Sequence, residues 1–238
     1  MLITIYGFKE ELELKYKMSE NDNDHPDKNN DAKEAIARFA AVFRFLPLAA
    51  VLNDSVFVCH GGLFKREEDV LLADIEAIDR CREPPDDGLM CDLLWSDPGL
   101  KDGRQRSRRG LGIAFGPDVT KRFLMINRLL LLVRSHEVKD RGFDVQHDGK
   151  CVTVFSAANY CDVVGNLGAV LVFDPVGSDG SDALAVNDDG GEIEKLKTTP
   201  GLRPRFIEFA ASPRPKKDKR SLNDKLAEMG LVPKAFPY

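Results

Sequence analysis

Two short apolar runs that each end in a histidine constrain the fold of this chain most strongly. His60 closes the run that starts at Ser55, and His136 closes the run that starts at Leu129. Apolar runs of this length, bounded by glycine or charge, are typical of buried parallel strands. In open α/β sheets, active sites form at the carboxyl ends of such strands. The pattern therefore predicts an α/β fold in which the two imidazoles share one site.

A metal ion is the ligand that two neighbouring histidines suggest, although a lone histidine at a strand end is more often structural. The second nitrogen of a metal-bound imidazole is usually held by a carboxylate or a carbonyl, and Glu137 follows His136 directly. A dinuclear hydrolytic centre also needs oxygen ligands, usually aspartates. The residues themselves leave two interpretations open: a shared metal site, or two structural histidines.

Charge and cysteine content narrow the class of protein. The chain has 238 residues, a net charge of -5 and a pI of about 5.5, which argues against non-specific binding of nucleic acid. No stretch approaches the roughly 18 consecutive apolar residues that span a bilayer. Its five cysteines are odd in number and scattered, as is typical of reduced thiols. We expect a globular protein of the cytoplasm or nucleus, with no nucleic-acid and no membrane partner.

Helical patterns occur in four segments, 9–17, 31–46, 67–82 and 117–128. The second segment begins with a capping box of Asp31 and Glu34 and ends at Pro47. Its apolar residues recur at helical spacing and predict one buried face. The residues of that face are Ile36, Phe39, Val42 and Phe43.

The clearest strand signal beyond the two histidine-bearing runs is a hairpin. Asp148-Gly149 separates the alternating runs 142–147 and 150–155, and Asp-Gly between such runs favours a tight turn. Further strands are expected at 167–174 and 206–209. The remaining segments are polar and rich in turn residues, which predicts surface loops and a tail. These segments are 18–31, 175–201 and the residues from Ser212 onward, with a helical pattern at 221–229.

An arginine is the best candidate to hold a phosphoryl oxygen, because a guanidinium can make a bidentate, charge-assisted contact. Arg109 is the preferred residue. Three other arginines crowd the same loop, and spacing alone does not choose among the four. The other three are Arg104, Arg106 and Arg108.

The segment after the hairpin contains a tyrosine that can line a pocket. Tyr160 can offer its ring and hydroxyl to a ligand, or it can be a loop residue with a buried ring. Cys161 is expected to be buried and inert. His25 and His147 are expected to be exposed and uninvolved.

Five motifs occur in the order and with the spacing of a known family: VFVCHGGL, CDLLWSDP, RRGLGIAFG, LVRSHE and VTVFSAANYC. They make the chain resemble the phosphoprotein phosphatases, which are serine/threonine protein phosphatases. EPPDDGLMCDLLWSDP and LRPRFIEFAASPRP look like the type 5 subgroup, which carries tetratricopeptide repeats. The resemblance implies a metallophosphatase β-sandwich flanked by helices. Residues 1–211 would be the C-terminal part of a calcineurin-like catalytic domain, with polar insertions at 18–31 and 177–201, and residues 212–238 a basic tail.

The resemblance also implies a role for each matching residue. His60 and His136 match the two histidine ligands of the second metal. Arg109 matches an arginine that holds the substrate phosphate, and Tyr160 matches a tyrosine of the pocket. Cys161 matches a cysteine that cyclic peptide toxins attack. The implied reaction is attack of a metal-activated hydroxide on phosphoserine or phosphothreonine, with two divalent ions (manganese, iron or zinc). The implied partners are phosphoprotein substrates and, in the full-length protein, a chaperone.

Three motifs of the family are absent from the sequence: Gly-Asp-x-His-Gly, Gly-Asp-x-x-Asp-Arg-Gly and Gly-Asn-His-Glu. They would supply the other metal ligands, a second phosphate arginine and the histidine that protonates the leaving group. Ala158 also replaces a proline before Asn159-Tyr160, which predicts a looser loop. We therefore expect a catalytic domain without its N-terminal half, inactive alone. The alternative is a phosphatase-like interaction module without activity, and a phosphoesterase for small esters fits the motifs less well.

Overall fold

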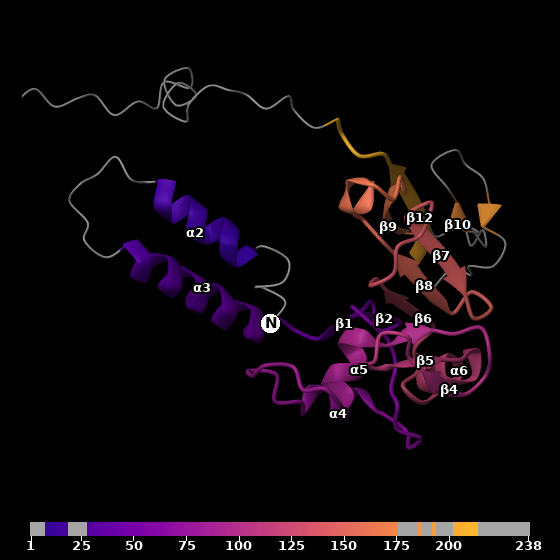
Figure 1. The fold of residues 1–238 in the computed structure, drawn as a ribbon. Coiled ribbons are helices and arrows are strands. Elements are labelled where there is room, and N and C mark those ends of the chain that lie inside the picture. The colour runs from indigo at the N-terminus through magenta and orange to yellow at the C-terminus, as the bar shows by residue number, and fades with distance from the viewer. Residues whose placement is uncertain (1–7, 19–27, 176–184, 187–191, 194–201, 214–238) are drawn as a thin grey trace, which may run out of the picture.

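Two packed β-sheets and a small third sheet form the body of the computed structural model, with short helices beside them and a pair of longer helices apart from them (Figure 1). The structure describes residues 8–18, 28–175, 185–186, 192–193 and 202–213. Most of the insertion at 177–201, the tail helix expected at 221–229 and His25 lie outside the described residues. Within these residues, no helix is both long enough and apolar enough to cross a membrane.

A five-stranded sheet contains both histidine-bearing strands, in the order β1-β2-β6-β8-β7. Its centre is parallel and consists of β2 (Val56–Cys59), β6 (Leu131–Arg134) and β8 (Cys151–Val154). Antiparallel strands form the two edges, β1 (Ala49–Leu52) and β7 (Phe143–Gln146). The prediction of adjacent parallel strands is confirmed, and so is the hairpin, which β7 and β8 form.

A second sheet of four strands has the order β11-β10-β12-β9. Its main pair is β9 (Gly168–Pro175) and β12 (Leu202–Phe209), which are antiparallel along their full length. The two short strands are β10 (Ala185–Val186) and β11 (Glu192–Ile193). Both strands expected in this part of the chain are present, and the last one is longer than its apolar residues predicted.

The two sheets pack face to face through an apolar layer. Val56, Leu131 and Val152 of the first sheet form one buried cluster with Phe206 of the second. The ring of Phe206 is fully buried and stacks on Phe143 with 3.9 Å between ring centroids. Side chains that alternate along each strand therefore fill the space between the sheets, and the expected β-sandwich is confirmed.

The opposite face of the five-stranded sheet is covered by α6 (Pro117–Ile126) and by the segments that lead to it. Phe57 of β2 and Phe123 of α6 meet edge to face, with 5.0 Å between ring centroids. Pro117 occupies the first turn of the helix, where its missing N–H costs nothing. Because this face is also apolar, the parallel strands are buried on both sides, as their continuous apolar runs predicted.

A small sheet and two short helices lie between β2 and α6 in the sequence. The sheet has the order β3-β5-β4 and consists of β3 (Asp97–Pro98), β4 (Arg104–Arg106) and β5 (Ile113–Phe115). The helix α5 (Leu89–Trp95) leads directly into β3. The helix expected over 67–82 is wrong in length, because only α4 (Leu72–Glu76) forms there.

The physical reason for the short α4 lies at its start. The Asp74 carboxylate accepts a hydrogen bond from the Leu71 backbone N–H, which starts the helix late. The same carboxylate accepts a hydrogen bond from Arg66, so the chain before Leu71 is held by side-chain contacts instead of helical ones. The apolar spacing alone does not reveal this competition.

Two helices, α2 (Phe8–Met18) and α3 (Lys28–Phe45), pack against each other apart from the sheets (Figure 1). The buried face predicted for α3 is wrong, since Phe39, Val42 and Phe43 are 43%, 57% and 45% exposed. Their main apolar partner is one ring, that of Phe8, with its centroid 5.3 Å from the Phe39 ring. A helix pair with so few apolar partners leaves its apolar stripe open to solvent.

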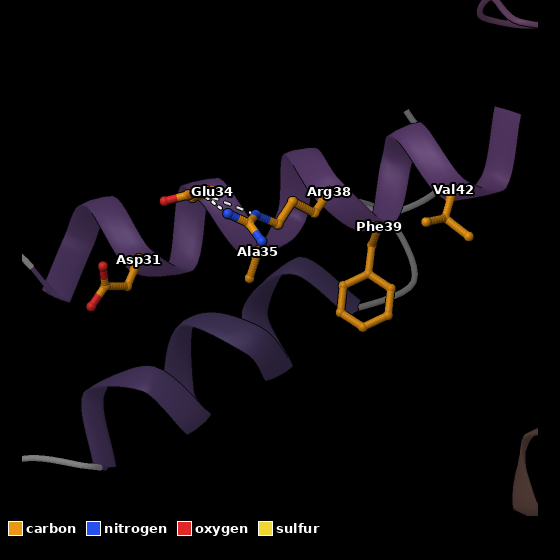
Figure 2. A pocket seen from close by; sticks show the side chains of 6 residues that line it. All are labelled: Asp31, Glu34, Ala35, Arg38, Phe39 and Val42. Atoms are coloured by element: carbon orange, nitrogen blue, oxygen red, sulfur yellow. Dashed lines mark hydrogen bonds and ion pairs between the residues drawn. The ribbon is translucent and has the colours of Figure 1, made fainter.

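A hollow of about 420 Å³ runs along this exposed side of α3 (Figure 2). Arg38 hydrogen-bonds to Glu34 at its rim, and Phe39 projects toward α2. Neither predicted metal histidine lines the hollow. Its lining residues are Asp31, Glu34, Ala35, Arg38, Phe39 and Val42.

His147 is buried, which corrects the expectation that it is exposed and uninvolved. It follows β7 at the hairpin turn, and its two ring nitrogens both have partners. Nδ1 lies 2.8 Å from the Thr120 hydroxyl of α6, and Nε2 lies 2.8 Å from the Gly99 carbonyl. A neutral ring that donates from Nε2 and accepts at Nδ1 satisfies both contacts. His147 therefore joins the hairpin, α6 and the segment after β3.

We expect His147→Gln to reduce the pH dependence of stability. Burial lowers the pKa of His147, while the Gly99 carbonyl and nearby aspartates oppose this shift. The unfolded chain then binds more protons than the folded chain as pH falls below about 6.5. Stability from this residue is thus present at pH 7.5 and is lost as the pH drops toward the lowered pKa. Denaturant titrations at pH 7.5 and 5.5 measure the free energy of unfolding of both chains. If the wild-type and variant chains lost the same free energy of unfolding between the two pH values, the prediction would be contradicted.

Candidate metal centre

The two predicted histidines meet at the carboxyl ends of β2 and β6. The Ser135 backbone N–H donates to the His60 carbonyl at 3.0 Å, which ties the two strand ends together. His60 Nε2 lies 3.0 Å from His136 Nδ1, and the rings are nearly perpendicular. His136 has a φ of 70°, a left-handed backbone conformation that costs energy in a residue other than glycine. The chain therefore holds this imidazole in place at an energetic cost, a pattern that is frequent at functional sites.

Two glycines after His60 let the site pack closely against α5. A Cβ on Gly61 would lie 2.5 Å from the backbone of Leu94 and Trp95, so a larger residue there would move the helix. The Gly61 N–H instead donates to the Leu93 carbonyl at 2.7 Å. This contact brings the Trp95 ring edge to face with His136, with 5.5 Å between centroids.

Both imidazoles are held in the neutral form. Burial is the main cause that lowers the pKa of His60, and the positive charges of Arg134 and Arg109 add to it. Burial also lowers the pKa of His136, to about 4, with Arg109 as the next cause and Asp97 opposing it. Neutral imidazole is the form that ligates metals. The environment thus favours the ligand form of both histidines at neutral pH.

The structure distinguishes Arg109 from the other arginines of its loop. Its Nη2 donates to the His136 carbonyl at 3.1 Å, and its Nε donates to the Asp97 carboxylate at 2.7 Å. Its own backbone N–H donates to the Ser107 hydroxyl, which fixes the turn. Arg104 points elsewhere, to the Phe64 carbonyl. Arg109 is therefore the arginine beside the histidines.

Sequence reasoning missed Arg134, a fully buried arginine at the end of β6. It donates to the Asp97 carboxylate at 2.7 Å and to the Glu137 carboxylate at 2.9 Å. It also donates to the carbonyls of Gly61 and Ser96. Arg134 thus connects the segments that carry His60, His136 and Arg109. A charge inside a buried strand was the available signal, because such a charge needs partners.

Sequence reasoning also missed Asp97, the residue that begins β3. Its carboxylate accepts hydrogen bonds from both Arg109 and Arg134. The negative charge of this carboxylate partly offsets the positive charges of the two guanidinium groups, which lie close to the neutral imidazoles. It therefore fixes the direction of Arg109 without contacting either histidine by a hydrogen bond.

The residues present fit part of a metal site. Two nitrogens that each lie about 2.1 Å from one metal ion are roughly 3 Å apart when the nitrogen–metal–nitrogen angle is near 90°. The two imidazole nitrogens here are 3.0 Å apart, which matches that spacing. Within the described residues, His136 Nε2 is buried without a hydrogen-bond partner. Glu137 does not orient it, as the sequence suggested, because Arg134 and Lys139 engage that carboxylate. No group of three or more possible ligand side chains occurs in the described part of the chain.

Tyr160 lies on the loop after β8, in the short turn η1 (Tyr160–Asp162), and is 41% exposed. Its ring packs edge to face on Phe155, with 5.2 Å between centroids. In the described part of the chain, no hydrogen bond or ring contact joins it to His60 or His136. Direct contacts therefore join three of the four predicted site residues, His60, His136 and Arg109, within the described part of the chain.

The loop around Tyr160 is held by a buried asparagine, another residue that the sequence reasoning missed. Asn166 accepts a hydrogen bond from the Tyr160 N–H and donates to the Ala157 carbonyl. Cys161 is exposed, which corrects the expectation of a buried thiol. Its φ of 55° turns the chain outward, and a loop with several left-handed residues does not bury a side chain by strand alternation.

Comparison with known proteins shows which proteins the chain is similar to. The chain is 48% identical to serine/threonine-protein phosphatase 5 of Arabidopsis thaliana over 211 residues, which are 89% of this chain and 32% of that protein. It is 41% identical to the Rattus norvegicus protein of the same name, over 96% of this chain and 38% of that protein. The chain spans about a third of the length of the curated relatives it matches.

A solved structure agrees with the fold. It is described as a protein serine/threonine phosphatase from Saccharomyces cerevisiae with similarity to human phosphatase PP5. The likeness has a TM-score of 0.65 and 37% identity, over 78% of this chain and 53% of that one. The resemblance to type 5 phosphoprotein phosphatases is thereby confirmed.

A family match covers more than half of the chain. Residues 10–140 match the family described as calcineurin-like phosphoesterase. Its members are metallophosphoesterases, which implies divalent metal ions as cofactors. The chain therefore belongs to the calcineurin-like phosphoesterase family.

Proposed function

We propose that this chain supplies one half of the active site of a serine/threonine protein phosphatase. The observation that carries the proposal is the 3.0 Å approach of His60 Nε2 and His136 Nδ1, with Arg109 bonded to the His136 carbonyl. The relatives support the reaction class, because the matched proteins are serine/threonine phosphatases. The proposed substrates are proteins that carry phosphoserine or phosphothreonine.

In this proposal His60 and His136 hold one divalent ion, and Arg109 holds a phosphoryl oxygen. A divalent ion there supplies Lewis-acid polarisation of the phosphoryl group. Asp97 and Arg134 fix the position of Arg109 and of the two strand ends. Tyr160 is proposed to contact the substrate at the edge of the site. Other ligands would have to come from residues outside these two strand ends.

The identity of the metal, the location and the partners are also proposals. Manganese, iron and zinc all accept imidazole ligands, so each is a proposed occupant. The cytoplasm or nucleus is proposed because all five cysteines are unpaired thiols, as is typical of reducing compartments. A chaperone partner is proposed for a longer protein that contains this chain, on the resemblance to type 5 enzymes alone.

We expect Arg109→Lys to weaken binding of a phosphoserine mimic roughly tenfold, since one lost charge-assisted hydrogen bond is worth about 1.5 kcal/mol. Lysine keeps the charge but loses the planar fork that meets Asp97 and a phosphoryl oxygen together. The measurement is fluorescence anisotropy of a peptide with the phosphonate analogue of phosphoserine, in the presence of Mn²⁺. Equal affinity for the wild-type and variant chains would contradict the role of Arg109.

The same titration decides between this function and an interaction module without activity. A module that binds partners elsewhere should not distinguish the phosphonate peptide from its serine counterpart. The proposed half-site should prefer the phosphonate peptide, and Arg109→Lys should reduce that preference. Binding of both peptides with equal affinity would favour the interaction module.

A further inference from the structure

The loop that carries Arg109 is strongly basic in a chain that is acidic overall. Residues 101–109 contain five basic side chains and one acidic side chain, against a net charge of -5 for the chain. Two of the arginines are engaged by the protein, Arg104 with the Phe64 carbonyl and Arg109 with Asp97. The excess positive charge therefore lies at the edge of the proposed phosphate site.

Arg106 and Arg108 differ from their two neighbours. Both are exposed, and within the described residues neither side chain has a hydrogen bond or ion pair. Two of the nearby carboxylates have other partners, because Asp97 binds Arg109 and Arg134, and Asp118 accepts from the Gly103 N–H. Two guanidinium groups thus remain available to a ligand.

These two exposed side chains come from the strand β4 and from the turn after it. Ser107, between them, is buried, and its hydroxyl accepts from the Arg109 N–H. Arg108 lies in the turn that follows, and its side chain is exposed there. Arg106 also lies in β4, opposite Ile113 of β5, which fixes its position in the small sheet. Both arginines therefore lie next to Arg109 in the chain, one in β4 and one in the turn.

We infer that Arg106 and Arg108 select substrates with acidic residues next to the phosphorylated residue. The inference rests on the proposed function. Consecutive residues of an extended peptide are about 3.5 Å apart, so the first neighbours of a phosphoserine held by Arg109 lie within reach of flanking arginine side chains. A carboxylate is the group that a free guanidinium pairs with best. Exposed pairs are individually weak, so the effect is one of preference between substrates.

The test uses the 238-residue chain and three peptides, in low and in high salt. Two carry the phosphonate analogue of phosphoserine, one flanked by glutamates and one by glutamines. The third carries serine flanked by glutamates. We expect the glutamate-flanked phosphonate peptide to bind roughly fivefold more tightly than its glutamine counterpart, as two exposed ion pairs allow. That difference in affinity should shrink at 1 M salt, because the Debye length is then only about 3 Å and exposed charges are screened.

Matched variants make the test specific. Arg106→Gln with Arg108→Gln should abolish the preference and leave the affinity for the glutamine-flanked peptide unchanged, whereas lysines at both positions should retain most of it. Lys15→Gln with Arg38→Gln removes the same charge from α2 and α3 and should retain the preference. If the preference survives in the double glutamine variant, or is absent from the wild-type chain, this inference is overturned while the proposed function still stands.

Two further outcomes separate this inference from the proposed function. If neither phosphonate peptide binds the wild-type chain, the proposed function fails and the inference fails with it. If the serine peptide binds as tightly as its phosphonate counterpart, the arginines form a general site for acidic peptides, and their role beside a phosphate is overturned.

Discussion

Replacing Arg134 with methionine is expected to destabilise the folded chain by about 3–5 kcal/mol, because it removes a buried guanidinium that pairs with two partly buried carboxylates and leaves two carbonyls without this donor. The guanidinium is fully buried and donates to two carboxylates, those of Asp97 and Glu137. It also donates hydrogen bonds to the carbonyls of Gly61 and Ser96. A methionine side chain has no donor that could replace these hydrogen bonds. Urea denaturation followed by far-UV circular dichroism measures the loss.

A matched control is available on the surface. Arg122 makes a two-pronged pair with Asp69, but both side chains are largely exposed. Arg122→Met should therefore leave the denaturation midpoint nearly unchanged. Arg134→Lys, which keeps a charge but not the geometry, should fall between the methionine variant and the wild-type chain. A methionine variant at position 134 as stable as the Arg122 variant would contradict the central role given to Arg134.

Phe206→Ala should cost about 3–5 kcal/mol, because truncation of a buried phenylalanine loses apolar burial and leaves a cavity. Phe206 is fully buried between the two sheets and stacks on Phe143. Loss of the Phe206 ring therefore weakens the packing of the second sheet on the first. The urea midpoint measures this effect, and a chain that no longer folds would show it as a loss of soluble protein.

The control for this prediction lies in the same strand. Phe209 is 40% exposed at the end of β12, so Phe209→Ala removes a ring of equal size with much less loss of burial. It should cost clearly less stability than Phe206→Ala. Equal effects at the two positions would show that the second sheet does not pack on the first as described.

Periodicity and turn chemistry predicted the central strands of the sandwich and the hairpin, but not the short strands β1, β10 and β11. The apolar runs before His60 and His136 are buried on both faces, and strands covered on both faces are mostly apolar. The same reasoning failed for α3, whose apolar residues have the spacing of a buried face but remain exposed. Spacing defines a face of a helix, and only a partner surface buries it.

The candidate site was predictable only in part. The histidines could be placed because the ends of parallel strands meet at one edge. Asp97 and Arg134 could not, because their pairing depends on how α5 and β3 pack against β6. The prediction that His147 is exposed rested on its place beside the hairpin turn, yet Thr120 and Gly99, far apart in sequence, hydrogen-bond to its ring. Residues whose role comes from contacts between distant segments leave little signal in local sequence.

Mn²⁺ binding to the chain, measured by the electron paramagnetic resonance signal of free Mn²⁺, tests the central claim most directly. His60→Ala and His136→Ala should each weaken binding at least tenfold, since loss of a ligand costs at least as much as loss of a residue that orients one. His147→Gln removes an imidazole elsewhere and should leave the affinity unchanged. If the wild-type chain and both alanine variants bind Mn²⁺ equally, these two histidines are not metal ligands.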